Sequence, residues 1–338
     1  MAIADDPQRR WYEPEAPPVW WTVSLAALYA GVSGLRRWLY RCGVLHTRRL
    51  PVPVIVVGNI VTGGAGKTPL TIALVEALRA HGYKPGVVSR GYGGSARTRM
   101  LLEARSDPAL VGDEPALIKS RTGVPVVVGA NRCEAAQLLL GQNVDAIIAD
   151  DGLQHYALAR DIEICVIDGM RRLGNGRLLP AGPLREPESR LQSVDFIVCN
   201  GGEPRDGEVS MTLAPTDVVA VDGSSRRQPL AAFVDRHVHA VAGIGNPRRF
   251  FETLRGQGVD VLEHPFPDHH RYVAADFDFG DDLPVLMTEK DAVKCRAFAQ
   301  PDWWSVPVSA MLPKSFFDAI AARIAHCQPD QESATRAS

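Results

Sequence analysis

The sequence lacks several features that would each point to a class of protein. Lys and Arg number 37 against 39 Asp and Glu, a net charge of -2, so no basic excess indicates a nucleic-acid-binding protein. No two of the six cysteines have C-x-x-C spacing, and some lie in apolar runs, such as Cys165 between Ile164 and Val166. This pattern disfavours a disulfide framework or a zinc site and fits free thiols in a reducing compartment. Internal repeats and runs of like charge are also missing, and nothing in the sequence indicates an obligate protein partner.

The N-terminal region contains the longest uncharged stretch. Residues 16–35 carry no charge, which is about the length of a membrane span, but their glycine, serine and threonine residues dilute the hydrophobicity. Five arginines follow, and this bias places the rest of the chain on the cytoplasmic side: Arg36, Arg37, Arg41, Arg48 and Arg49. We predict a membrane-associating helix here, which either spans the bilayer, lies in its interface or packs on the domain.

A phosphate-binding loop follows the first β-branched run. Residues 53–57 predict a buried strand, and residues 70–78 carry apolar side chains at helical spacing. Between them lies the glycine-rich segment Gly63, Gly64, Ala65, Gly66, Lys67, Thr68 and Pro69. In this context backbone N–H groups cradle a phosphate, Lys67 reaches the β- and γ-phosphates, and the Thr68 hydroxyl binds Mg²⁺. One departure from G-x-x-x-x-G-K-[ST] is Val61, which stands where the first glycine is usual.

Further apolar runs complete an α/β domain. Residues 145–150 end in Asp150, which has the place of the second, metal-associated carboxylate of a P-loop site. Strands are also predicted at 86–89, 124–128, 162–168 and 195–199, and Asn131 is predicted to cap a helix. Strands alternating with helices predict a doubly wound parallel sheet with its ligand at the carboxyl ends of the strands.

The second half of the chain predicts a smaller α/β domain. A strand is expected to open in the run 238–245, and further strands are expected at 259–262, 283–287 and 304–308. Gly243 and Gly245 lack the third glycine of G-x-G-x-x-G, since Arg248 stands there, so a tight turn is favoured over a dinucleotide site. The predicted division is a tail and helix at 1–50, a nucleotide-binding domain at 51–200, a polar linker at 201–235, an α/β domain at 236–328 and a tail at 329–338.

Several charged residues have competing structural and functional interpretations. Asp113 and Glu114 begin a helix at Pro115, where carboxylates commonly cap, although one could face a metal and the other a substrate. The sequence alone does not distinguish His269 from His270. The arginines of the long loop suit anionic headgroups and equally a solvated surface: Arg171, Arg172, Arg177, Arg185 and Arg190.

Together these motifs resemble the tetraacyldisaccharide 4′-kinase family, whose members phosphorylate a lipid A precursor. The resemblance covers nearly the whole chain and is carried by residues 58–69, 89–93, 112–115 (Gly-Asp-Glu-Pro), 150–155, 179–186, 268–269 and 288–291. Leu153 stands where the family more often has an aromatic residue.

The resemblance implies an inner-membrane enzyme with its catalytic body on the cytosolic face. It implies transfer of the γ-phosphate of ATP, with Mg²⁺, to the 4′-hydroxyl of an acylated glucosamine disaccharide 1-phosphate lipid. Asp113 would be the catalytic base, paired with His269, and Glu114 and Asp150 would be metal-associated. The other matched positions would line the site: Ser89, Tyr92, Arg132, Asp151, Gln154, His155 and Arg185.

Three other kinds of protein compete with this interpretation. A membrane-associated switch ATPase would have a signature lysine before the paired glycines, where Thr62 stands, and a GTPase would want Asn-Lys-x-Asp, to which residues 288–291 are only loosely similar. A nucleotide-sensing scaffold without chemistry would be distinguished by an assay for lipid-dependent ATP consumption.

Overall fold

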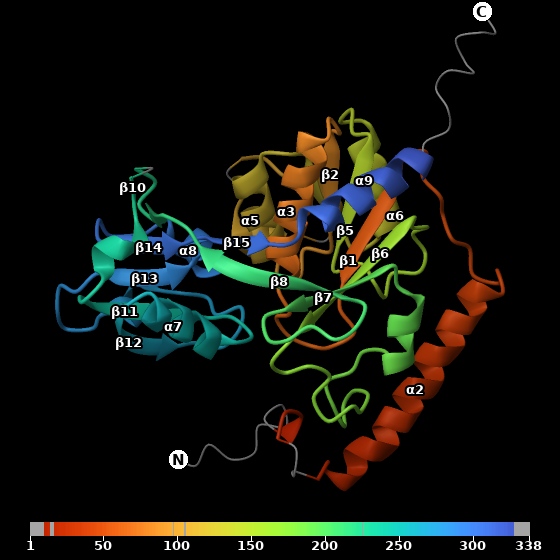
Figure 1. Cartoon of the computed structure of the whole chain (residues 1–338), viewed down its shortest axis with the longest axis horizontal. Helices are drawn as coiled ribbons and strands as arrows, with labels where there is room; N and C mark the ends of the chain where they lie inside the picture. The colour runs from red at the N-terminus through yellow and green to blue at the C-terminus, as the bar shows by residue number, and fades with distance from the viewer. Residues whose placement is uncertain (1–9, 14–16, 97, 105, 225, 328–338) are drawn as a thin grey trace, which may run out of the picture.

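The computed structural model describes residues 10–13, 17–96, 98–104, 106–224 and 226–327. Figure 1 shows two α/β units beside each other, with helix α2 (Trp20–Arg41) on the outside of the larger unit. Each unit is built around its own sheet. The predicted α/β class, with a P-loop domain and a second, smaller domain, is confirmed.

The larger unit contains a nine-stranded sheet in the order β15-β8-β7-β6-β1-β5-β2-β4-β3. Pairing is parallel from β8 to β4, and only the outer strands β15 and β3 run antiparallel to their neighbours. The strands are β1 (Val54–Gly58), β2 (Pro85–Ser89), β3 (Met100–Leu101), β4 (Val126–Val128), β5 (Ala146–Asp150), β6 (Ile162–Asp168), β7 (Phe196–Asn200), β8 (Glu208–Pro215) and β15 (Val308–Met311). The central strands are buried along their whole length, which is why they read as continuous apolar runs.

Helices cover both faces of this sheet. One face packs against α3 (Lys67–Ala80), α5 (Asp113–Thr122) and α9 (Lys314–Cys327). The other packs against α6 (Arg132–Leu140) and the loop segments around Leu153 and Leu184. As predicted, Asn131 caps α6, because its side chain accepts the N–H groups of Cys133 and Glu134. Short helical turns, α4 (Pro108–Val111) and η1 (Glu188–Ser193), lie in the connections.

The smaller, C-terminal unit has a six-stranded sheet in the order β10-β9-β14-β13-β11-β12. Its strands are β9 (Val218–Ala220), β10 (Arg227–Gln228), β11 (His237–Ala242), β12 (Asp260–Pro265), β13 (Val285–Thr288) and β14 (Trp303–Val306). Helix α7 (Pro247–Gly256) and turn η2 (Leu230–Phe233) pack on one face. The other face carries α8 (Glu289–Cys295), turn η3 (Ala274–Phe277) and a cluster of aromatic side chains.

The segment 201–235 differs from the predicted polar linker. Strand β8 joins the larger sheet, and β9, which follows after two residues, joins the smaller one. Strands β14 and β15 return along the same route, so an antiparallel two-stranded ribbon connects the units, and α9 packs on the larger unit. The polar composition misled the prediction because much of β8 is only partly buried.

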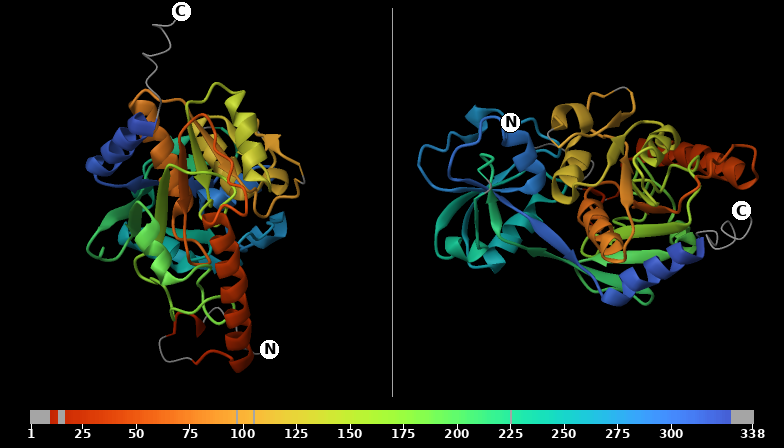
Figure 2. Two further views of the ribbon diagram at one scale, coloured as in Figure 1. Left: turned by 90° about the vertical axis from the view of Figure 1, so that its right-hand side faces the viewer. Right: turned by 90° about the horizontal axis from the view of Figure 1, so that it is seen from above.

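Helix α2 lies along the larger unit and extends beyond it (Figures 1 and 2). Only Thr22 and Ala26 of this helix are buried, whereas eight of its large apolar side chains are exposed: Trp20, Trp21, Val23, Leu25, Leu28, Val32, Leu35 and Trp38. Across the described ranges, no helix combines the length and the apolar character that crossing a membrane requires.

Candidate active site

The phosphate-binding loop connects β1 to α3 as predicted. Gly63 and Gly66 have φ values of 103° and 97°, in the left-handed region that favours glycine. Val61, which departs from the common pattern, is buried and forms a bridge with Leu184. Where other P-loops have a glycine, this chain therefore has a buried valine in a segment that is held by its β-bridge to Leu184.

Lys67 lies in the first turn of α3, close to an acidic residue that follows β5. Its Nζ is 3.5 Å from Asp151 Oδ1, and Arg185 Nη1 lies 3.2 Å from both carboxylate oxygens of Asp151. Burial raises the pKa of Asp151, but Lys67 and Arg185 outweigh burial and lower the pKa to about 2. Asp151 is therefore a permanent anion that holds two cations at the loop.

Asp150, at the end of β5, has one carboxylate oxygen free of hydrogen bonds. Its Oδ1 accepts a hydrogen bond from Thr71 Oγ1 at 3.0 Å, whereas the buried Oδ2 has no partner within the described residues. Burial, with the nearby charges of Glu114 and Asp151, raises the pKa of Asp150 to about 7. A cation would be stabilised beside Asp150, because this carboxylate is buried and other negative charges lie close to it.

These residues fit Mg²⁺, which prefers oxygen ligands and is typically held by one or two carboxylates together with substrate phosphates. Asp150 offers its unpaired oxygen, Glu114 lies close enough to affect its pKa, and Thr68 stands directly after Lys67. The described segments contain no group of three or more His, Cys, Asp or Glu side chains that could hold a metal ion.

Asp113 and His269 meet across the two units. Asp113 is the first residue of α5, and His269 Nδ1 lies 3.1 Å from its Oδ2. Gly112 is the N-cap of α5, and Asp113 and Glu114 lie in its first turn, where the helix dipole favours carboxylates. Burial raises the pKa of Asp113, but the hydrogen bond with His269 and the charges of Lys294 and Lys290 lower it overall.

His269 is held in an uncommon backbone conformation, with a φ of 61°. The ring of Tyr92 packs edge-on against it at 5.2 Å. His270, by contrast, binds Asp276 of its own unit at 3.0 Å. Only His269 therefore lies at the junction of the units, in agreement with the Asp-His pattern of the sequence.

Two lysines near this pair were not among the predicted site residues. Lys290 Nζ lies 3.0 Å from Asp268 Oδ1, 3.5 Å from His269 Nε2 and 3.7 Å from Glu114 Oε1. Lys294 Nζ is 3.7 Å from Asp113 Oδ2. Their four-residue spacing on the helix that follows a predicted strand was the available signal.

Arg132 and Gln154, both predicted to line the site, hold main-chain groups at the ends of β5 and β1. Arg132 is buried and donates to the carbonyl oxygens of Asp150 and Asp151. Gln154 Nε2 donates to the Asn59 carbonyl and to Glu186, each at 3.0 Å. Glu186 also accepts a hydrogen bond from the Tyr156 hydroxyl. Glu186 was not predicted as a site residue, although it belongs to the 179–186 motif.

Ser89 lies at the end of a strand, and His155 lies in the loop between β5 and β6. Ser89 ends β2 and is buried. His155 Nε2 is buried with no hydrogen-bond partner in the described part of the chain. Burial and the charge of Arg132 lower the pKa of His155 to about 4, so this ring is neutral at physiological pH.

The arginines of the long loop are mostly bound to protein groups rather than gathered for a headgroup. Arg172 pairs with Glu208 at 2.6 Å, and Arg190 pairs with Glu163 in the interior. Arg171 pairs with Asp168 at 3.3 Å, and Arg185 pairs with Asp151. Ion pairs therefore hold this loop to the rest of the unit. Of the five arginines, Arg177 alone has no ion pair with the described residues.

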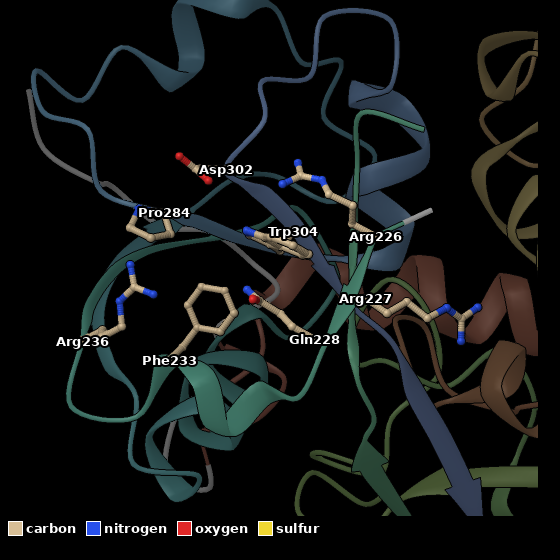
Figure 3. Close-up of a pocket in the computed structure, with 8 residues that line it drawn as sticks. All are labelled: Arg226, Arg227, Gln228, Phe233, Arg236, Pro284, Asp302 and Trp304. Carbon is tan, nitrogen blue, oxygen red and sulfur yellow. The ribbon is translucent and has the colours of Figure 1, made fainter. Parts of the chain in front are cut away.

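A separate cavity of about 440 Å³ lies in the C-terminal unit (Figure 3). It is lined by Arg226, Arg227, Gln228, Phe233, Arg236, Pro284, Asp302 and Trp304. Arg226 pairs with Asp222 at 2.9 Å, and Arg227 points away from Trp304. Pro284 and Asp302 precede β13 and β14, so the cavity is at the opposite end of these strands from α8 and the site.

Comparison with known proteins agrees with this geometry. The family model described as tetraacyldisaccharide-1-P 4'-kinase matches residues 18–325. The tetraacyldisaccharide 4'-kinase of Stenotrophomonas maltophilia is 51% identical over 331 residues, which cover 95% of this chain and 97% of the relative. That of Methylobacillus flagellatus is 53% identical over 292 residues, covering 86% and 87%.

A solved structure matches the fold as well. The crystal structure of LpxK from Aquifex aeolicus in complex with ATP aligns with a TM-score of 0.75 at 28% identity, covering 89% of this chain and 98% of that one. The sequence resemblance is thereby confirmed over both units and helix α2. The chain belongs to the tetraacyldisaccharide 4′-kinase family.

Proposed function

We propose that this kinase transfers the γ-phosphoryl group of ATP to the 4′-hydroxyl of a tetraacyl glucosamine disaccharide 1-phosphate. The observation that carries the proposal is the Asp113–His269 hydrogen bond, which joins the two units beside the P-loop. A base placed there meets an acceptor hydroxyl only when ATP and lipid lie between the units. Such closure excludes water from the phosphoryl group.

In the reaction, the hydroxyl oxygen bonds to the γ-phosphorus while the bond from that phosphorus to the β–γ bridging oxygen breaks, and ADP leaves. The ionised Asp113 carboxylate takes the hydroxyl proton, and His269 holds the carboxylate in position through Nδ1. Lys67 stabilises negative charge on the phosphates as it shifts toward the leaving oxygen. Mg²⁺, held by Thr68, Asp150 and Glu114, would neutralise phosphate charge when bound.

We also propose that the enzyme acts at the inner membrane through α2. The exposed apolar side chains of this helix suit insertion into the membrane interface. At its other face, Tyr29 OH donates to the carbonyl oxygen of Arg185 at 2.9 Å, and Arg37 lies 3.5 Å from Glu186. The helix thus connects the bilayer, where acyl chains remain, to the residues around Asp151.

The test is to incubate the full chain with γ-labelled ATP, Mg²⁺ and the tetraacyl disaccharide 1-phosphate in mixed micelles. We expect label on the lipid at the 4′ position, identified by mass spectrometry, and ADP formation that depends on the lipid. ATP consumption independent of lipid, or no transfer at all, would overturn the proposal in favour of the switch ATPase or the scaffold.

A further inference from the structure

Side chains from outside the P-loop hold two of its carbonyl groups. Arg171 Nη2 donates to the Gly64 carbonyl oxygen at 3.0 Å, and Asn200 Nδ2 donates to the Ala65 carbonyl oxygen at 2.9 Å. In a trans peptide, the carbonyl of one residue and the N–H of the next point in opposite directions. These two bonds therefore orient the N–H groups of Ala65 and Gly66 away from Arg171 and Asn200, as a phosphate-binding nest requires.

Asn200 is placed so that its amide has one useful orientation. It ends β7 with 1% of its surface exposed, and its Oδ1 accepts a hydrogen bond from Arg249 Nη2 at 2.8 Å. Because arginine only donates, this bond fixes Oδ1 toward Arg249 and leaves the Nδ2 donor for the P-loop. A Cβ at position 66 would lie 2.2 Å from Nδ2, so the contact also requires Gly66.

Both carbonyl contacts continue into the C-terminal unit. Arg249 belongs to α7, and Arg171 Nη1 donates to the carbonyl oxygen of Gly245 at 3.2 Å. Gly245 itself packs on the loop, since a Cβ there would lie 2.9 Å from the Gly64 nitrogen. The turn between β11 and α7 is thus seated directly on the P-loop.

We propose that Asn200, Arg249 and Arg171 are positioning residues that couple the approach of the C-terminal unit to the shape of the P-loop. When residues 245–249 sit against the loop, its N–H groups are aimed at the phosphates of ATP. The same approach brings His269 to Asp113, so phosphate cradle and base form together. The inference rests on the proposed function only where it concerns lipid phosphorylation. The expected effect on ATP binding does not depend on the identity of the lipid.

The experiment compares Arg249→Gln, Arg249→Lys and Asn200→Asp with the wild type. Arg248→Gln is the matched control, since Arg248 precedes Arg249 on α7 but its side chain is exposed and pairs with Glu252. We measure the Kd for ATP by calorimetry without lipid, the KM values for ATP and lipid, kcat, and the melting temperature. Arg249→Gln should raise the Kd and KM for ATP about tenfold or more, as loss of a charge-assisted hydrogen bond does.

The KM for lipid and the melting temperature of Arg249→Gln should change little, Arg249→Lys should recover part of the loss, and Arg248→Gln should match the wild type. Asn200→Asp should be the most impaired, because it puts an acceptor against the Ala65 carbonyl. If Arg249→Gln is stable and binds ATP as the wild type does, the coupling is refuted, whatever Asn200→Asp does. If the wild type binds ATP but phosphorylates no lipid, the proposed function fails while the ATP affinities still decide this inference.

Discussion

Around the Asp113–His269 contact, the two α/β units differ in the side chains that they bring to the site. The P-loop unit presents four carboxylates near the site: Asp113, Glu114, Asp150 and Asp151. The C-terminal unit presents His269, Lys290 and Lys294. All the charges that lower the pKa of Asp113 come from the second unit. The carboxyl group of Asp113 therefore has its lowered pKa only where the two units meet.

The largest effect on activity is expected when the Asp113–His269 contact between the units is removed. Asp113→Asn and His269→Ala should each lower kcat by about 10²–10⁴, the usual contribution of a general base, with ATP affinity largely kept. Residues that act as one unit are non-additive, so the double variant should be little worse than the poorer single one. Measuring kcat for all four combinations at saturating ATP and lipid checks this, and multiplying losses would show that the residues act separately.

A change confined to the P-loop unit should be nearly as severe. Lys67→Ala removes the cation beside the phosphates and should lower kcat about 10²–10³. The effect should appear in steady-state assays at saturating ATP, with the fold unchanged by circular dichroism. Near-normal turnover would mean that the P-loop does not bind the reacting phosphates.

Membrane contact should depend on the P-loop unit alone, since α2 packs against that unit. Leu28→Ser with Val32→Ser should weaken binding to anionic vesicles by at least about tenfold, because each change removes an exposed apolar group. Turnover of micellar substrate should remain. Val44→Ser, also exposed but outside α2, is the control in the sedimentation assay, and equal losses in both would discount the helix.

The C-terminal unit should tune the acidity of the first unit's base. Lys290→Gln removes a charge that lowers the pKa of Asp113, so that pKa should rise. The acid limb of the kcat/KM profile should then move to higher pH, so the loss of activity relative to the wild type should be largest at about pH 4, near the ordinary pKa of an aspartate, and small at pH 6. The plateau at higher pH should change less, and an unmoved acid limb would contradict the assignment.

Asp150 should have the smallest measurable effect, on the stability of the ligand-free protein. Its pKa is about 7 in the folded protein, above the ordinary aspartate value of 3.8. The folded state therefore binds more protons than the unfolded state between these values, and stability falls as pH rises through that window. Asp150→Asn should therefore raise the melting temperature at pH 8, by roughly 2–4 °C for each kcal/mol gained. At pH 4 the two proteins should melt alike, and a gain that persists at pH 4 would point to packing instead.

The P-loop unit was largely predictable from sequence because its signals are local. Buried parallel strands read as apolar runs, and the glycine loop between strand and helix carries its own motif. Asp113 and His269 were selected by family resemblance rather than by spacing, since 156 residues separate them. Lys294, Glu186 and Arg249 were not predicted as site residues, because their contacts are with segments that are distant in the sequence.

The ribbon of β8–β9 and β14–β15 has a consequence for synthesis. A ribosome makes residues 308–327 after every other part of the P-loop unit, yet β15 completes the edge beside β8 and α9 covers one face of the sheet. Until they emerge, the nascent unit exposes an open strand edge and the apolar surface that Phe316, Ile320 and Ile324 later bury. Helix α2, by contrast, emerges near the start. Under the membrane association proposed above, contact of α2 with the bilayer would precede completion of the nucleotide-binding unit, and the nascent enzyme would reach the membrane before it could bind ATP.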